Sequence, residues 1–250
     1  PKINNQLTII NSSGGYTMIN DNDSINSGGS SGGNLMPDNC KFFGTCLKEK
    51  KFVYFIDISG SMQNFRMNGV TLMEVAKKQL IDQIKAIPVN DDYYLNVYKF
   101  GYVSTPVFPR PLSVNQDVKD RAIRFVSALR ATDGDNLPFV GIGQAIQMEH
   151  VEQMIILTDG GVNDRVACFH DSIIGKFSDC VYRYNEKIRN NHHSIPYYKT
   201  KPVPIDTISL YFDFCSGSNV PLHYITRWSF NPIWMGELAS KNNGKCKFIP

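Results

Sequence analysis

Two apolar stretches, each ending in an aspartate beside a glycine turn, constrain the fold of this 250-residue chain more than any other feature. Residues 52–56 (FVYFI) lead directly into Asp57, and residues 154–157 (MIIL) lead through Thr158 into Asp159. Unbroken apolar runs of this length are typical of strands buried on both faces, as in a parallel sheet covered by helices. Both aspartates are therefore expected at the carboxyl ends of central strands, where such sheets bind ligands.

Hydroxyl groups accompany the first aspartate. Ser59 and Ser61 follow Asp57 at alternate positions and give the pattern DxSxS. Hard oxygen donors that converge at a sheet edge would suit a divalent cation such as Mg²⁺ or Ca²⁺. The same residue types could instead cap a helix and bind only backbone amides, and the motif alone leaves that alternative open. Two strands that deliver an aspartate to the same edge are harder to explain by capping.

Together these segments resemble the metal-ion-dependent adhesion site (MIDAS) of the von Willebrand factor type A (vWA) family, whose pattern is DxSxS, a threonine, and an aspartate after a later strand. The resemblance covers roughly residues 48–250. It implies an α/β fold with a doubly wound, mostly parallel sheet, helices on both faces and one antiparallel edge strand. It also implies one divalent cation, Mg²⁺ or Ca²⁺, bound by Asp57, Ser59, Ser61 and Asp159 together with a residue of a third loop.

The third loop departs from the family pattern. Where the family has GGTN, residues 133–136 read DGDN, so that Asp135 stands at the threonine position; Thr132 is the alternative ligand. Three carboxylates about 4 Å apart would repel by roughly 4 kcal/mol per pair at an effective dielectric constant of about 20. A cation or a bound proton must offset that repulsion. With Asp135 as a ligand, we expect tighter metal binding and weaker recruitment of an acidic partner than at a threonine-containing site.

The rest of the chain alternates strands with helices, as a doubly wound sheet requires. Apolar residues recur near the helical period in several segments, and β-prone runs separate them. Prolines within and after one of these runs favour an edge strand there. Helices are expected at residues 71–87, 117–129, 136–148, 177–189 and 232–240, and further strands at residues 93–100, 103–108 (the edge strand), 205–214 and 246–249.

Composition divides the chain into two parts. Residues 1–43 are rich in Asn, Ser and Gly and are expected to form a flexible N-terminal segment. Residues 44–250 are expected to form the vWA-like domain, with an insertion at about residues 164–202 that would rise near the aspartates. The β-prone run at residues 7–10 could add a strand to a neighbouring sheet.

The chain has six cysteines and no CxxC pair of the kind that indicates zinc. Disulfides are the preferred interpretation and would place the protein outside the cell or on its surface; buried thiols in a cytosolic protein are the alternative. Sequence alone does not decide the connectivity. In the fold that the resemblance implies, proximity favours Cys40 with Cys46, Cys168 with Cys180, and Cys215 with Cys246.

Charge and motif content favour a protein partner. The formal net charge is only +3 and the basic residues are scattered, so we expect no nucleic-acid partner. No apolar stretch approaches the roughly 20 residues that span a bilayer, so we expect no direct membrane insertion. No GxSxG elbow, P-loop or complete GxGxxG occurs, and we predict no enzymatic activity.

The predicted function is that of an extracellular metal-dependent adhesion or interaction module. The alternative is a structural subunit of a surface filament or assembly, in which the cation only braces the loops and the N-terminal segment docks on a neighbour.

Overall fold

The computed structural model describes residues 8–10, 16–18, 42–43, 47–132, 138–160, 165–167, 174–190, 202–218, 220 and 232–250. The chain divides into two compact units, Pro1–Pro37 and Asp38–Pro250. In the first unit, β1 (Thr8–Ile10) pairs antiparallel with β2 (Tyr16–Met18). The β-prone run near the N-terminus is therefore a strand, and the partner described for it lies in its own unit.

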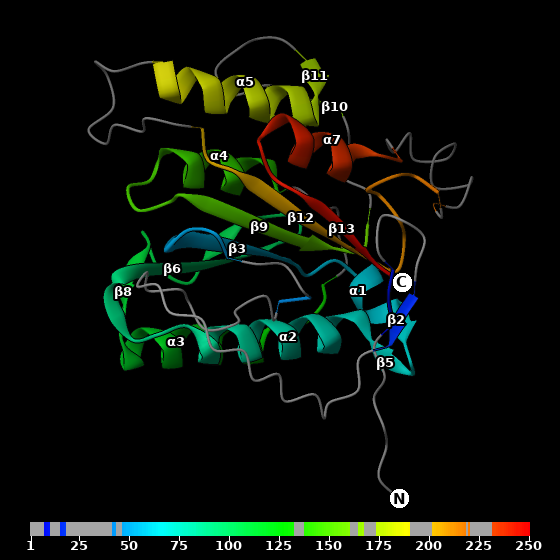
Figure 1. Ribbon diagram of the computed structural model, residues 1–250, viewed down its shortest axis with the longest axis horizontal. Helices are drawn as coiled ribbons and strands as arrows, with labels where there is room; N and C mark the ends of the chain where they lie inside the picture. Colours follow the sequence, from blue (N-terminus) through cyan, green and yellow to red (C-terminus); the bar gives the residue numbers. More distant parts are fainter. Residues whose placement is uncertain are drawn as a thin grey trace, which may run out of the picture. The chain divides into compact units, whose positions relative to one another are not determined.

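A seven-stranded sheet forms the centre of the second unit (Figure 1). The strand order is β13-β12-β9-β3-β6-β7, and β8 also pairs with β6. The strands from β13 to β6 are parallel, whereas β7 and β8 run antiparallel to β6. This confirms the predicted mostly parallel sheet with an antiparallel edge. The strand bounds are β3 (Lys51–Asp57), β6 (Asn90–Phe100), β7 (Thr105–Pro106), β8 (Leu112–Val114), β9 (Gln153–Thr158), β12 (Ile205–Leu210) and β13 (Cys246–Ile249).

Helices cover both faces of the sheet, as predicted (Figure 1). One face carries α2 (Leu72–Ala86) and α3 (Gln116–Ala128), and the other carries α4 (Phe139–Gln147), α5 (Phe177–Asn190) and α7 (Trp234–Lys241). All five lie within three residues of their expected bounds. No helix in the described part of the chain is both long and apolar enough to cross a membrane.

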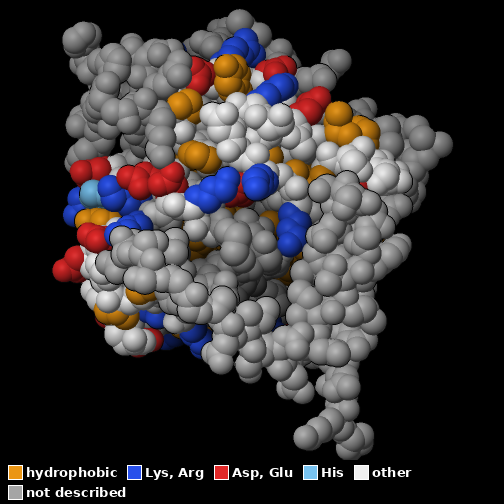
Figure 2. Space-filling model, viewed as in Figure 1, with side chains coloured by type: hydrophobic (Ala, Val, Ile, Leu, Met, Phe, Trp, Pro, Cys, Tyr) orange, Lys and Arg blue, Asp and Glu red, His pale blue; other side chains and the backbone are white. Residues whose placement is uncertain are grey.

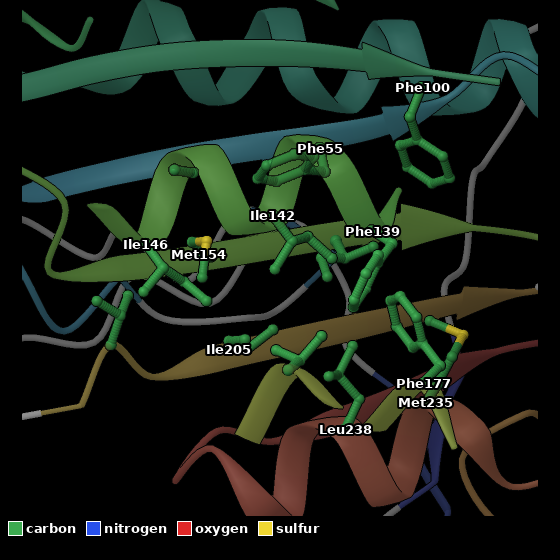
Figure 3. Close-up of a cluster of buried hydrophobic side chains, with 14 of the residues drawn as sticks. Phe55, Phe100, Phe139, Ile142, Ile146, Met154, Phe177, Ile205, Met235 and Leu238 are labelled. Atoms are coloured by element: carbon green, nitrogen blue, oxygen red, sulfur yellow. The ribbon is translucent and has the colours of Figure 1, made fainter. Parts of the chain in front are cut away.

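Alternate residues of the central strands supply two cores. Every residue of β3 from Phe52 to Asp57 is buried, because helices cover it from both sides. Figure 3 shows the core beneath α4, α5 and α7, where Phe55 of β3 lies among side chains of these helices. Trp234 is fully buried in this core, so it is part of the packing and not of an exposed surface.

A glycine lets α4 approach the sheet closely. A Cβ at Gly141 would lie 2.7 Å from the Cβ of Ser104 and 3.0 Å from a ring carbon of Phe55. Both distances are too short for an ordinary contact. Gly141 and Gly143 are both buried in α4, and at Gly141 the missing side chain is what allows the close packing.

Sequence reasoning missed a short helix and a hairpin directly after Asp57. The helix α1 (Ser61–Asn64) is followed by β4 (Arg66–Met67) and β5 (Val70–Thr71), which pair antiparallel. The two residues between these strands, Asn68 and Gly69, have φ values of 51° and 82°. Positive φ at both positions is typical of a type I′ hairpin turn, and an Asn-Gly pair is its strongest sequence signal.

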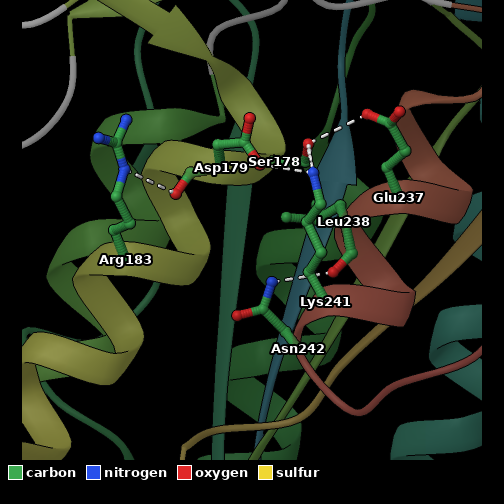
Figure 4. A network of polar contacts seen from close by, with 7 residues as sticks. All are labelled: Ser178, Asp179, Arg183, Glu237, Leu238, Lys241 and Asn242. Atoms are coloured by element: carbon green, nitrogen blue, oxygen red, sulfur yellow. Dashed lines mark hydrogen bonds and ion pairs between the residues drawn. The ribbon is translucent and has the colours of Figure 1, made fainter.

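A polar network joins α5 to α7 on the outer side of the molecule. Lys241 donates to the carboxylate of Asp179 at 2.5 Å and to the hydroxyl of Ser178 at 3.2 Å (Figure 4). Ser178 in turn donates to Glu237 at 3.2 Å. Because α5 lies within the predicted insertion at 164–202, at least this part of it packs into the helical layer. The same segment contains β10 (Arg165–Ala167) and β11 (Ile174–Lys176), which pair antiparallel.

One predicted disulfide is present in full. Cys215 and Cys246 are bonded, with their Cα atoms 5.6 Å apart. Cys180 is also disulfide-bonded, and its partner lies outside the described residues. Cys40, Cys46 and Cys168 lie outside them as well, so their pairing stays a prediction.

Candidate metal-binding site at the carboxyl edge of the sheet

The strand order brings the two aspartates together. The chain passes from β3 to β6 on one side and later returns to β9 on the other, so the order reverses between β3 and β9. Ile56 of β3 pairs with Leu157 of β9, and neighbouring strands lie about 5 Å apart. Asp57 and Asp159 follow these positions and are both fully buried. They therefore meet at the switch point, where doubly wound sheets bind their ligands.

Hydrogen bonds join four of the predicted ligands into one network. The backbone N–H of Ser59 donates to Asp57 Oδ1 at 2.7 Å, which folds the loop back over the carboxylate. The hydroxyls of Ser59 and Ser61 lie 2.9 Å apart, and Ser61 donates to Asp159 Oδ1 at 2.9 Å. The start of α1 at Ser61 places that hydroxyl between the two strand ends.

A fifth polar residue of the site was not assigned a role from the sequence. The hydroxyl of Thr158 donates to Asp57 Oδ2 and accepts from the backbone N–H of Gly160 at 3.1 Å. Thr158 is fully buried. Its only sequence signal was its place immediately before Asp159, at the end of a strand adjacent to Asp57.

The start of the third loop lies beside the serine loop. Thr132 forms an isolated bridge with Ser59, and its N–H donates to the carbonyl oxygen of Ile58 at 2.7 Å. The Thr132 hydroxyl donates to the same carbonyl at 3.3 Å. Asp135, the other candidate ligand of this loop, lies outside the described residues, as do residues 133–137.

Burial dominates the electrostatics of the site. It raises the pKa of Asp57 from 3.8 to about 6, although hydrogen bonds from Thr158 and Ser59 act in the opposite direction. Burial, together with the nearby charge of Asp57, raises the pKa of Asp159 well above its ordinary value. Asp159 Oδ2 is buried and has no hydrogen-bond partner in the described structure. Two buried carboxyl groups with an unpartnered oxygen cannot both ionise without compensation.

The donor set fits a hard divalent cation. Carboxylate and hydroxyl oxygens are the ligands that Mg²⁺ and Ca²⁺ take, and a cation would stabilise both ionised carboxyl groups. Among the described residues, no group of three His, Cys, Asp or Glu side chains is placed to hold a metal. The network here has two such residues, Asp57 and Asp159, and its other oxygen donors are hydroxyls.

Exposed apolar side chains flank the site along the same edge. Tyr102 and Val103 follow the end of β6 and are 71% and 63% exposed. Val140 lies in the first turn of α4, next to Gly141, which packs against Ser104 of the same loop. On the other side Tyr211 follows the end of β12. Since β12, β9, β3 and β6 are consecutive, apolar groups lie at both ends of a row about 15 Å long with the aspartates in the middle.

A hollow of about 630 Å³ lies at the opposite edge of the sheet. Its lining is mostly charged and includes His150. Figure 2 shows acidic and basic side chains gathered beside a pale-blue histidine side chain. Lys50 pairs with Asp92 and Lys51 pairs with Glu152, each at 3.0 Å. Because charges of both signs pair across this hollow, its lining favours no particular ligand charge. The adjacent histidines His192 and His193 lie outside the described residues.

Comparisons with known proteins show sequence similarity over about half of this chain. No family model matches the chain. The chain is 32% identical over 121 residues to von Willebrand factor A domain-containing protein 5A of Mus musculus, and 28% identical over 123 residues to a von Willebrand factor A domain-containing protein of Dictyostelium discoideum, DDB_G0292016. These matches cover 46% and 47% of this chain but only 15% and 12% of the relatives.

A solved structure agrees with this similarity. The von Willebrand factor type A structure from Catenulispora acidiphila superposes with a TM-score of 0.53 at 17% sequence identity. It covers 81% of this chain, and the match spans 39% of that structure. At this identity the superposition shows the fold alone.

Proposed function

We propose that this chain, which has a vWA-like fold and distant vWA-containing relatives, is a cation-dependent protein interaction module. The proposed ligands of the cation, Mg²⁺ or Ca²⁺, are Asp57, Ser59, Ser61, Asp135 and Asp159. The network that joins four of these residues at the switch point of the sheet supports the proposal most strongly, together with the buried Asp159 Oδ2, which has no partner among the described residues.

The chain's own residues would have distinct roles at such a site. A bound cation supplies the positive charge that allows both buried carboxyl groups to ionise. Asp57 is held by the Ser59 N–H and the Thr158 hydroxyl, so its orientation is set before any ion binds. The hydroxyls of Ser59 and Ser61 can rotate to turn their lone pairs toward a cation. Asp135 would add a further negative charge and leave little attraction for an acidic partner.

The proposed partner is a protein ligand or a neighbouring subunit that docks over this edge. Tyr102, Val103 and Val140 are each more than half exposed, and apolar groups rimmed by polar ones are typical of interaction surfaces. An extracellular or cell-surface location is supported by the Cys215–Cys246 disulfide, since such bonds persist in oxidising compartments. We assign no catalytic residue.

Calorimetric titration with Mg²⁺ and with Ca²⁺ tests the proposal. We expect the wild-type protein to bind at least one ion at millimolar concentration or below, and Asp159→Asn to abolish binding. Asp206→Asn is the matched control: Asp206 is also buried, but it lies at the opposite edge and accepts from Gln153 and from the Lys245 N–H. Absence of binding by the wild-type protein, or equal binding by both variants, would contradict the assigned ligands.

A structural subunit remains the second candidate. The short strand β1 in the N-terminal unit favours it, because an extended segment can complete the sheet of a neighbouring copy. Deleting residues 1–33 and measuring the oligomeric state by light scattering separates the two functions. Loss of an assembly that is independent of cation would favour the structural subunit.

A further inference from the structure

We propose that the Cys215–Cys246 disulfide sets the cation affinity of the candidate site, by holding Tyr211 against Phe65 and thereby positioning Ser61. Reduction of this bond would weaken cation binding without touching a ligand. This inference rests on the proposed function, since it requires that the site bind a cation.

Ser61 belongs to an element that cannot hold itself in place. The helix α1 is a single turn, and an isolated helix of this length is unstable. Two neighbours hold the turn: Met62, which is fully buried, and Phe65, whose N–H donates to the carbonyl oxygen of Ser61 at 3.0 Å. The orientation of the Ser61 hydroxyl toward Asp159 therefore depends in part on how Phe65 is packed.

Phe65 packs against a segment distant in sequence. Its ring stacks on Tyr211, with centroids 4.9 Å apart and planes inclined by 19°. Its ring also meets the ring of Phe212 edge-on at 5.1 Å. Both arrangements are among those that aromatic pairs prefer. The segment after β12 thus forms the wall against which the turn bearing Ser61 rests.

The backbone of Tyr211 is held in an unfavourable conformation. Its φ is 68°, a region that residues other than glycine rarely adopt and keep only where their surroundings fix them. Its N–H donates to the carbonyl oxygen of Ile249 in β13 at 2.9 Å. The disulfide joins Cys215, four residues beyond Tyr211, to Cys246 of the same strand. A covalent bond and a hydrogen bond thus close a ring that fixes this backbone.

Opening the bond would release that ring. Both cysteines are only partly buried, so a dithiol reductant can reach them. In the exchange, the S–S bond becomes two thiols and the two thiols of the reductant become a disulfide. Tyr211 is then free to relax to negative φ and leave Phe65. We expect α1 to fray, which removes the Ser61 hydroxyl from its fixed place beside Asp159.

The double variant Cys215→Ser/Cys246→Ser tests this coupling in the full chain by calorimetric titration with Mg²⁺ and Ca²⁺. We expect the Kd to rise by several-fold to about tenfold, the range that loss of one aromatic pair would give. Treating the wild-type protein with dithiothreitol should raise the Kd at least as much, since the reagent also opens the disulfide of Cys180. The same treatment should change the Kd of the variant less than that of the wild-type protein. An unchanged Kd in the variant would overturn the inference.

Variants of the Tyr211 ring test whether the coupling passes through the stack of Phe65 on Tyr211. Tyr211→Leu should raise the Kd as the cysteine variant does, whereas Tyr211→Phe, which keeps the ring, should not. Tyr102→Leu is the matched control, because Tyr102 is an exposed tyrosine at the other end of the row. Equal effects of the Tyr211→Leu and Tyr102→Leu variants would refute a specific route through the Phe65 stack.

Hydrogen exchange gives a readout that does not depend on the ion. With chelator present, the amides of residues 62–65, which bond to Ser59, Gly60 and Ser61, should exchange faster in the cysteine variant. Unchanged exchange would overturn the coupling. If the oxidised wild-type protein binds neither ion, the proposed function fails, and this exchange measurement still decides whether the disulfide holds α1.

Discussion

In the absence of divalent cations, the free energy of unfolding of this protein should fall as the pH rises from about 4 to about 7. The pKa of Asp57 is about 6 in the folded protein, against 3.8 for an exposed aspartate. Between these values the folded state binds more protons than the unfolded state, so the free energy of unfolding falls as the pH increases. The pKa of Asp159 is also raised, and it extends the fall to higher pH.

The size of the effect follows from the shift at Asp57. A difference of about 2 pKa units, at 1.36 kcal/mol per unit, corresponds to a loss of about 3 kcal/mol from this group above pH 6. That is a large fraction of the roughly 5–15 kcal/mol that stabilises a typical protein. A bound cation should oppose the loss, because it stabilises the ionised carboxyl groups.

Urea unfolding in chelator, at several pH values between about 4.5 and 7.5, measures this dependence. Asp57→Asn should reduce the slope, since it removes one of the two carboxyl groups with a raised pKa, whereas Asp206→Asn at the opposite edge should leave the slope unchanged. Added Mg²⁺ or Ca²⁺ should stabilise the protein more at pH 7 than at pH 5. A free energy of unfolding that is constant or rises over this range in chelator would refute the reasoning.

Three further predictions concern other parts of the chain. The variant Cys215→Ser/Cys246→Ser opens a closed loop with a sequence separation of 31, so thermal unfolding should report a loss of about 3–4 kcal/mol; reductant that destabilises this variant as much as the wild-type protein would contradict the assignment. Asp135→Thr should weaken cation binding in calorimetry and increase the affinity for an acidic peptide. If Asp135→Thr leaves the cation Kd unchanged and Thr132→Val raises it, Thr132 is the ligand of the third loop instead. Gly244→Ala should destabilise the protein by about 1–3 kcal/mol in urea, because a Cβ there would lie 1.9 Å from the carbonyl oxygen of Ile205; unaltered stability would show that this turn can shift.

The sequence by itself determined the architecture of the second unit. The apolar runs before Asp57 and Asp159 could be satisfied only by strands covered on both faces, and the helical period between them required crossovers. Those local patterns suffice to predict the strands and helices, because the spacing of apolar residues along the chain shows which faces of each element are buried. The same runs placed both aspartates at one edge, since parallel strands end on the same side.

Only the tertiary structure decided how the site is held. The bond from Thr158 to Asp57, the bridge between Ser59 and Thr132, and the stacking of Phe65 on Tyr211 each join residues separated by more than 70 positions. No local pattern encodes such pairs, because they depend on which strands become neighbours and on how loops pack above them. The burial of Asp159 Oδ2, which has no partner in the part of the chain that the structure describes, also emerged only there, since burial is a property of the packed molecule and not of a motif.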